Sequence, residues 1–289
     1  MTMRFEKWQA LGNDYLIVEQ DELPFELTPA RVRKLCAPHF GVFADGVLVL
    51  SPPEEGRHVA ELRIFNPDGS EAELSGNGAR EAILYLRRRG WTDRDEFAIG
   101  TAAGTIRPQI TGTDRSRVDM GHASLTSDDF PAGPPDGRGS VPSAGREWAF
   151  RHVSIGNPQA SIRVAGEAEL ASIDLAAAGP AIEGSELFPN RTNVSWYAEL
   201  EPGRIRARIF ERGVGETLSS GTGATGAAVA YVHEHAAGTR PERVTVVLDG
   251  GELEVEVAAD LRVHLTGWAR PVFAGTISEA FEKELHETE

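Results

Sequence analysis

The stretch Ser75-Gly-Asn-Gly-Ala-Arg-Glu-Ala82 recurs about half a chain later as Ser220-Gly-Thr-Gly-Ala-Thr-Gly-Ala227, with the shared pattern S-G-x-G-A-x-x-A. Each copy follows an acidic stretch with strand-like character and opens an apolar helical pattern. A repeat on this scale is typical of a chain built from two copies of one structural unit. We therefore predict two related lobes, each with a Ser-Gly-x-Gly turn at the start of a helix.

This turn has a physical use at the start of a helix. The first amide groups of a helix lack intrahelical partners, and the helix end carries partial positive charge. Glycine lets the backbone approach a ligand closely, so a carboxylate or a phosphate fits there. A purely structural interpretation is that Ser75 and Ser220 only cap their helices. The presence of two copies favours a ligand site lined by two helix starts.

Alternating apolar residues predict strands in both halves, and helical periodicity predicts a few helices. The predicted strands are residues 4–8, 15–19, 46–51, 60–66, 96–99, 105–110, 117–120, 148–154, 160–164, 192–198, 204–210, 244–248, 252–258 and 262–266. The predicted helices are residues 31–37, 78–88, about 223–235 and 277–286. Strands and helices do not alternate regularly, so we assign the fold class α+β.

The division into lobes follows the composition along the chain. Residues 127–145 are rich in Pro, Gly, Ser and Asp and predict a long surface connection. We place one lobe at residues 1–121, completed by residues 268–289, and the other at residues 122–267. The active site is expected in the cleft between them.

Composition excludes several classes of function. The net charge is −15, which argues against nucleic acid or an anionic membrane as the partner. No apolar stretch resembles a secretory signal or a membrane span. Cys36 is the only cysteine, so no intrachain disulfide can form, and the histidines lack metal-ligand spacing. We expect a cytoplasmic protein without a metal.

Longer motifs carry a family resemblance. The stretch Phe65-Asn-Pro-Asp-Gly-Ser-Glu-Ala-Glu-Leu-Ser-Gly-Asn-Gly-Ala-Arg80 resembles the first signature of the diaminopimelate epimerase family. Glu211-Arg-Gly-Val-Gly-Glu-Thr-Leu-Ser-Ser-Gly-Thr-Gly-Ala224 resembles the second signature. Shorter matches follow in the expected order and cover nearly the whole chain: Leu11-Gly-Asn-Asp14, Ala44-Asp-Gly46, Gly156-Asn-Pro158, Arg191-Thr-Asn-Val194 and Leu265-Thr-Gly267.

The resemblance implies two pseudo-symmetric lobes, each with a curved, mostly antiparallel sheet around a central helix. It implies inversion of an amino-acid α-carbon by two opposed acid/base groups, without pyridoxal phosphate or another cofactor. The partner is then a small amino-acid substrate with carboxylate groups, and the protein is a possible homodimer. The implied substrate-binding residues are Asn13, Asn66, Gly76, Asn77, Asn157, Asn193, Arg212, Gly221 and Thr222. Arg212 suits the distal carboxylate of a diamino-diacid, because guanidinium binds carboxylate bidentately.

The chain departs from the family at the catalytic positions. The resemblance implies cysteines where Ser75 and Ser220 stand, and a histidine where Gln159 stands, whereas the polar partner Glu211 is kept. A thiol titrates near pH 8.5. A serine hydroxyl is far more basic when ionised, so it needs a neighbouring base. We expect Ser75, Ser220 and Glu211 to be catalytic, with reduced or altered activity.

Three functions are compatible with these residues. The first is diaminopimelate epimerase, which converts the L,L isomer to the meso isomer for lysine biosynthesis. The second is a one-base lyase or isomerase of the dehydratase type, with Glu211 as the base. The third is an amino-acid-binding protein without catalysis. The serines are explained either by deliberate substitution or by natural divergence, and Gln159 favours divergence because an engineer had little reason to change it.

Overall fold

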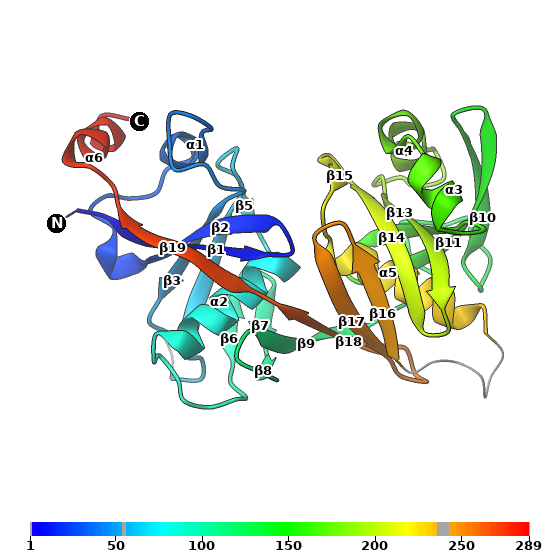
Figure 1. Ribbon diagram of the computed structural model, residues 1–289, viewed down its shortest axis with the longest axis horizontal. Coiled ribbons are helices and arrows are strands. Elements are labelled where there is room, and N and C mark those ends of the chain that lie inside the picture. The colour runs from blue at the N-terminus through cyan, green and yellow to red at the C-terminus, as the bar shows by residue number, and fades with distance from the viewer. Residues whose placement is uncertain (1, 54–55, 236–242, 289) are drawn as a thin grey trace. The chain divides into compact units, whose positions relative to one another are not determined.

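The computed structural model describes residues 2–53, 56–235 and 243–288 (Figure 1). The chain divides into two compact units. Unit 1 contains Met1–Val118 and Gly267–Glu289, and unit 2 contains Asp119–Thr266. No helix among the described residues is long and apolar enough to cross a membrane.

Unit 1 is built on an 8-stranded sheet in the order β19-β1-β2-β3-β4-β6-β7, with β5 paired to β4. Its strands are β1 (Arg4–Ala10), β2 (Asn13–Glu19), β3 (Val47–Ser51), β4 (Ala60–Phe65), β5 (Glu71–Ala72), β6 (Ile99–Thr101), β7 (Gly104–Ile106) and β19 (Arg270–Thr276). Its helices are η1 (Gln20–Glu22), α1 (Pro29–Cys36), α2 (Gly76–Arg88) and α6 (Glu279–His286). Strands β1 and β2 form a hairpin whose turn, Leu11–Gly12, has positive φ at both residues. This is the backbone of a tight two-residue hairpin.

Unit 2 contributes most of an 11-stranded sheet in the order β10-β11-β12-β13-β14-β16-β17-β18-β9-β8, with β15 paired to β14. The strands are β8 (Gln109–Ile110), β9 (Arg115–His122), β10 (Arg138–Ser143), β11 (Arg146–Ser154), β12 (Pro158–Arg163), β13 (Asn193–Glu201), β14 (Arg204–Glu211), β15 (Gly215–Thr217), β16 (Arg243–Leu248), β17 (Gly251–Val257) and β18 (Arg262–Trp268). The helices are α3 (Glu167–Ser172), α4 (Leu175–Glu183) and α5 (Gly221–His233).

The two units repeat one pattern of strand pairing. In unit 1, β1 and β2 pair antiparallel, β2 and β3 parallel, β3 and β4 antiparallel, β4 and β6 parallel, and β6 and β7 antiparallel. In unit 2, strands β11 to β14, β16 and β17 pair in the same sequence of directions. A short strand, β5 or β15, pairs beside the fourth strand of each set. The predicted α+β fold with two similar lobes and mostly antiparallel sheets is therefore confirmed.

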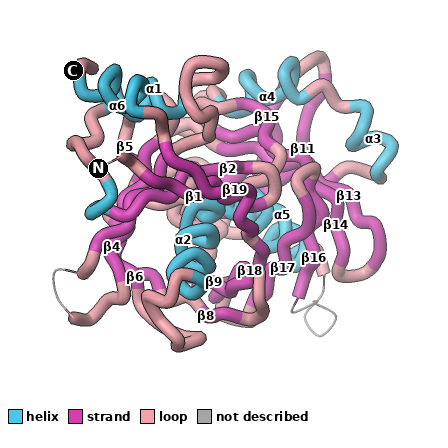
Figure 2. Tube along the Cα trace, turned by 60° about the vertical axis from the view of Figure 1, so that its left-hand side comes forward, coloured by secondary structure: helices cyan, strands magenta, loops and turns pink. Residues whose placement is uncertain are grey.

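One long helix packs against the sheet of each unit: α2 against β1, β2 and β3, and α5 against strands that include β12, β13 and β17 (Figure 2). Helix α5 consists largely of glycine, alanine and valine and is buried on all sides. Gly226 shows why small residues are required. A Cβ atom there would lie 2.8 Å from the Cβ of Gln159 on β12, which is closer than real contacts allow.

Several elements differ from the sequence-based predictions. Residues 127–145 are not one long connection, because β10 lies inside them at Arg138–Ser143. Strand β19 and helices α3 and α4 were not predicted. The predicted strand at residues 105–110 is split into β7 and β8, which belong to different sheets. The four predicted helices are confirmed as α1, α2, α5 and α6, with their ends shifted by a few residues.

Candidate active site

Ser75 occupies the N-cap of α2 in unit 1. Its backbone is extended, and its Oγ accepts a hydrogen bond from the Gly78 amide at 3.1 Å. The same oxygen accepts a second hydrogen bond, from the Tyr15 hydroxyl at 3.2 Å. The side chain is half-buried. Ser75 therefore caps α2 and also accepts a hydrogen bond from a side chain of β2.

Ser220 occupies the equivalent N-cap of α5 in unit 2. Its Oγ accepts from the Gly223 amide at 3.2 Å, and its hydroxyl donates to Glu211 Oε2 at 3.0 Å. The other carboxylate oxygen of Glu211 accepts from Thr217 Oγ1 at 2.8 Å. Glu211 is the last residue of β14, so the strand end and the helix start are joined through this hydrogen bond. A hydroxyl that donates to a carboxylate is the usual arrangement of a hydroxyl and its general base.

Burial raises the pKa of Glu211 above its ordinary value, although the hydrogen bonds from Thr217 and Ser220 act in the opposite direction. A carboxylate with a raised pKa accepts a proton more readily than one in water. Ser220 and Glu211 can therefore act together as a base, with the proton of the serine passing to the carboxylate.

The remaining predicted residues of unit 2 are linked by hydrogen bonds. Asn157 Nδ2 donates to Thr222 Oγ1 at 3.4 Å, and Asn157 Oδ1 accepts from Gln159 Nε2 at 2.7 Å. Asn193 Oδ1 accepts from the backbone amide of Arg212 at 2.8 Å. Gln159 is fully buried against α5. Its amide orients Asn157, and it cannot serve as a titrating group as a histidine would.

The guanidinium group of Arg212 is positioned to bind a ligand. It is exposed, and its Nη1 donates to the backbone carbonyl of Asn190 at 2.8 Å. No carboxylate among the described residues pairs with its guanidinium, and Glu211 beside it in the sequence bonds to Thr217 and Ser220 instead. A positioned cation without a protein partner can bind a carboxylate of a ligand.

The predicted residues of unit 1 are more dispersed. Asn13 Nδ2 donates to Asp45 Oδ2 at 2.8 Å, and Asn66 Nδ2 donates to Ser70 Oγ at 3.0 Å. Asn77 Oδ1 accepts from Arg80, which is buried on the next turn of α2. Within the described ranges, neither Asn13 nor Asn66 is hydrogen-bonded to Ser75. Gly76 begins the helix with its amide in the first turn.

Sequence reasoning missed two residues that contact the predicted catalytic residues: Tyr15 donates to Ser75, and Thr217 donates to Glu211. Tyr15 directly follows the Leu11-Gly-Asn-Asp14 motif, and Thr217 lies three residues before Ser220, inside the second signature. The position of Tyr15 beside one motif and of Thr217 inside another is the only sequence signal for them. The partners themselves depend on tertiary structure.

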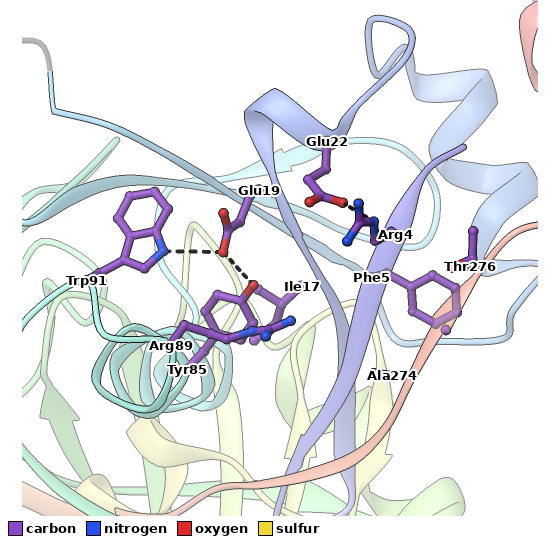
Figure 3. A pocket seen from close by; sticks show the side chains of 11 residues that line it. Arg4, Phe5, Ile17, Glu19, Glu22, Tyr85, Arg89, Trp91, Ala274 and Thr276 are labelled. Carbon is purple, nitrogen blue, oxygen red and sulfur yellow. Dashed lines mark hydrogen bonds and ion pairs between the residues drawn. The ribbon is translucent and has the colours of Figure 1, made fainter. Parts of the chain in front are cut away.

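A pocket of about 500 Å³ in unit 1 does not include any of the predicted site residues (Figure 3). Its polar side chains are already paired. Glu19 accepts hydrogen bonds from the Tyr85 hydroxyl at 2.8 Å and from Trp91 Nε1 at 3.2 Å, and Arg4 pairs with Glu22 at 3.3 Å. In the part of the chain that the structure describes, no group of three or more His, Cys, Asp or Glu residues is arranged to hold a metal.

Comparison with known proteins adds a separate line of evidence. The sequence model of the family described as diaminopimelate epimerase matches residues 5–126 and 151–271. A diaminopimelate epimerase from Synechococcus sp. (strain JA-3-3Ab) is 41% identical over 285 residues, which cover 96% of this chain and 99% of that protein.

Among solved structures, a phenazine biosynthesis protein of the PhzF family from Bacillus anthracis has a TM-score of 0.67 at 16% identity, covering 96% of this chain and 99% of that one. A predicted epimerase from Pseudomonas aeruginosa has a TM-score of 0.65 at 18% identity, with the same coverage of 96% and 99%. At such low identity these two structures establish the fold alone.

Proposed function

This chain belongs to the diaminopimelate epimerase family, and on that premise we propose that it inverts an α-carbon of diaminopimelate, converting the L,L isomer to the meso isomer. It is an isomerase of the amino-acid epimerase type, and lysine biosynthesis follows from that reaction. The substrate is a small molecule with carboxylate groups at both ends.

The observation that carries the proposal is the hydrogen bond from Ser220 to the half-buried carboxylate of Glu211, whose pKa is raised by burial. In one direction of the reaction, Ser220 Oγ takes the α-proton while the serine's own proton passes to Glu211. Ser75 exchanges a proton with the opposite face of the same carbon. Both groups sit at helix starts, where free amides and partial positive charge stabilise the carboxylate of a carbanionic intermediate.

We propose that substrate specificity comes from the charged and amide side chains that the family resemblance implies. We propose that Arg212 binds the distal carboxylate, which is supported by its exposed guanidinium and its lack of an acidic partner among the described residues. Asn13, Asn66, Asn77, Asn157, Asn193 and Thr222 would bind the amino and carboxylate groups, together with the amides of Gly76 and Gly221.

The serines set the expected rate. A hydroxyl is a weaker proton-transfer group than a thiol near neutral pH, and a mismatched acid/base group costs roughly 10²–10⁴-fold in rate. We propose that epimerisation by this chain is slow, and that Ser75→Cys/Ser220→Cys raises it.

The test follows α-proton loss by NMR in D₂O with L,L-diaminopimelate, for the parent chain and for the Ser75→Cys/Ser220→Cys variant. Exchange by the parent, faster in the variant, is the expected result. Exchange by the variant alone would show a diaminopimelate site whose serines do not transfer protons. Absence of exchange from both would overturn the assignment of diaminopimelate as substrate.

A second candidate is an elimination in which Glu211 is the single base. The difference between the serines favours it, because Ser220 contacts a carboxylate and Ser75 does not. Such an enzyme would release a keto acid, detectable as its hydrazone, and would not interconvert stereoisomers. A third outcome, in which ligand raises the melting temperature without any reaction, would identify an amino-acid-binding protein.

We further propose a cytoplasmic homodimer. Strand β19 is the edge of its sheet and exposes Val272 and Phe273, which are 55% and 46% accessible. An exposed apolar edge strand is a common place for pairing with a second chain. The cytoplasmic assignment is supported by the relatives, which are diaminopimelate epimerases and thus biosynthetic enzymes. Light scattering of the parent and of Phe273→Glu tests the dimer, and a monomeric parent would overturn it.

A further inference from the structure

The hydroxyl of Tyr15 is held against Ser75 by the fold of unit 1. Tyr15 lies on β2, is 5% exposed, and donates to Ser75 Oγ at 3.2 Å. Gly46 leaves room for its ring, since a Cβ atom there would lie 2.6 Å from Tyr15 Cε1. The phenol is therefore fixed by packing on the strand beside the start of α2.

The two serines take opposite parts in their hydrogen bonds. Ser220 donates its proton to a carboxylate, whereas Ser75 Oγ accepts from both the Tyr15 hydroxyl and the Gly78 amide. Among the described residues, none accepts the hydroxyl proton of Ser75, so that proton is free to go to a ligand. Two donors on one oxygen also stabilise negative charge on that oxygen when its proton leaves.

We propose that Tyr15 is a positioning residue that supplies a proton to Ser75. Tyr15 then serves Ser75 as Glu211 serves Ser220. This inference rests on the proposed epimerase function and adds a residue to it.

The proton transfers balance without a further reactant. When the carbanion is protonated, its electron pair forms the new C–H bond with the proton of Ser75, and the O–H electron pair stays on Oγ. Oγ then takes the phenolic proton, and the negative charge ends on the Tyr15 oxygen. A phenol titrates near pH 10, far below a serine hydroxyl, so the charge is more stable on tyrosine. In the reverse reaction the phenolate takes the proton back through Ser75.

The experiment uses Tyr15→Phe, which keeps the ring and removes only the hydroxyl. Deuterium exchange at the α-carbons in D₂O is followed by NMR from L,L-diaminopimelate and, separately, from the meso isomer. The control is Tyr85→Phe, which loses a buried hydroxyl on α2 whose partner is Glu19 in the pocket of Figure 3. Melting temperatures of both variants verify folding.

The expected result differs between the two isomers. In Tyr15→Phe, net epimerisation falls roughly 10²–10⁴-fold. Exchange survives from the isomer whose proton is removed by Ser220 and Glu211, and it is lost from the isomer whose proton is removed by Ser75. The control behaves as the parent from both isomers.

Equal behaviour of Tyr15→Phe and Tyr85→Phe would overturn the inference, as would an equal loss from both isomers. Activity confined to the Ser75→Cys/Ser220→Cys variant would overturn it too, while leaving the substrate assignment intact. Absence of α-proton exchange from both the parent and that variant would overturn the proposed function itself.

Discussion

Ser220 Oγ lies 3.0 Å from Glu211 Oε2, and this hydrogen bond joins the start of α5 to the end of β14. Because the carboxylate is the proton acceptor in this pair, its replacement by an amide removes the base and keeps the shape.

Glu211→Gln is expected to lower kcat roughly 10²–10⁴-fold with little change in KM, because the amide cannot take the proton of Ser220. The rate of α-proton exchange measures this. Glu216→Gln is the matched control, since Glu216 lies nearby on β15 and pairs with Arg208. A Glu211→Gln variant as active as the control would remove Glu211 from the mechanism.

The acid limb of the pH profile should lie above the ordinary carboxyl pKa. Burial raises the pKa of Glu211 from 4.5, and only its deprotonated form is a base, so activity is lost as pH falls through the raised pKa. Thr217→Val removes a hydrogen bond that favours the charged form and should move the limb to still higher pH. The profile of kcat/KM between about pH 4 and 8 reports this. A limb that moves to lower pH in Thr217→Val would contradict the assignment.

Arg212→Lys is expected to raise KM for diaminopimelate roughly 10- to 100-fold, the usual worth of a charge-assisted hydrogen bond. The value of kcat should change less, because the distal carboxylate is remote from the reacting carbon. Arg204→Lys is the control, since Arg204 forms a surface ion pair with Glu252 at 2.5 Å. An equal effect of both substitutions would mean that Arg212 contributes only general charge.

Glu81 gives a prediction about stability. It is fully buried on α2, where desolvation of its carboxyl group dominates over the backbone hydrogen bond from Tyr15. Burial raises the pKa of Glu81 well above its ordinary value, and the neighbouring Arg80 offsets only part of that effect. The contribution of this carboxyl to stability is therefore fully present below the unfolded pKa and is lost as pH rises through the folded pKa.

The glutamine of the Glu81→Gln variant cannot ionise. As pH rises from the unfolded pKa to the folded pKa of Glu81, the free energy of unfolding of the variant should increase relative to that of the parent by about 1.4 kcal/mol per pH unit. Urea unfolding at several pH values from about 4 upward measures the difference. A constant difference between the two proteins would show that Glu81 titrates alike in the folded and unfolded chains.

Local sequence signals predicted the framework of both units. The Ser-Gly-x-Gly stretches start α2 and α5 because serine caps and glycine turns act over a few residues. The resemblance to the epimerase family added Glu211 and Arg212 as candidates. The Tyr15–Ser75 contact was not predictable, because it joins residues far apart in the sequence through the packing of β2 beside α2.

Two of the strands that were not predicted, β10 and β19, share a physical reason. Strand β10 contains Pro142 and β19 contains Pro271, and both strands are sheet edges. An edge strand tolerates proline because one side of its backbone has no ladder partner, so composition indicates a loop where the sheet still continues. Helix α4 escaped prediction because it is short and contains Gly179 and Pro180, the two residue types that are least favourable inside a helix.

The pairing of β1 with β19 joins two segments that are more than 250 residues apart, from Arg4 beside Thr276 to Gln9 beside Arg270. On the ribosome, β1 is made long before its outer neighbour. The sheet of unit 1 therefore keeps an open edge until residues 270–276 have been made, whereas the residues of unit 2 are contiguous and can fold earlier. A chain cut short before residue 270 would leave β1 exposed as a permanent edge, so synthesis of β19 is a condition for the closed sheet of unit 1.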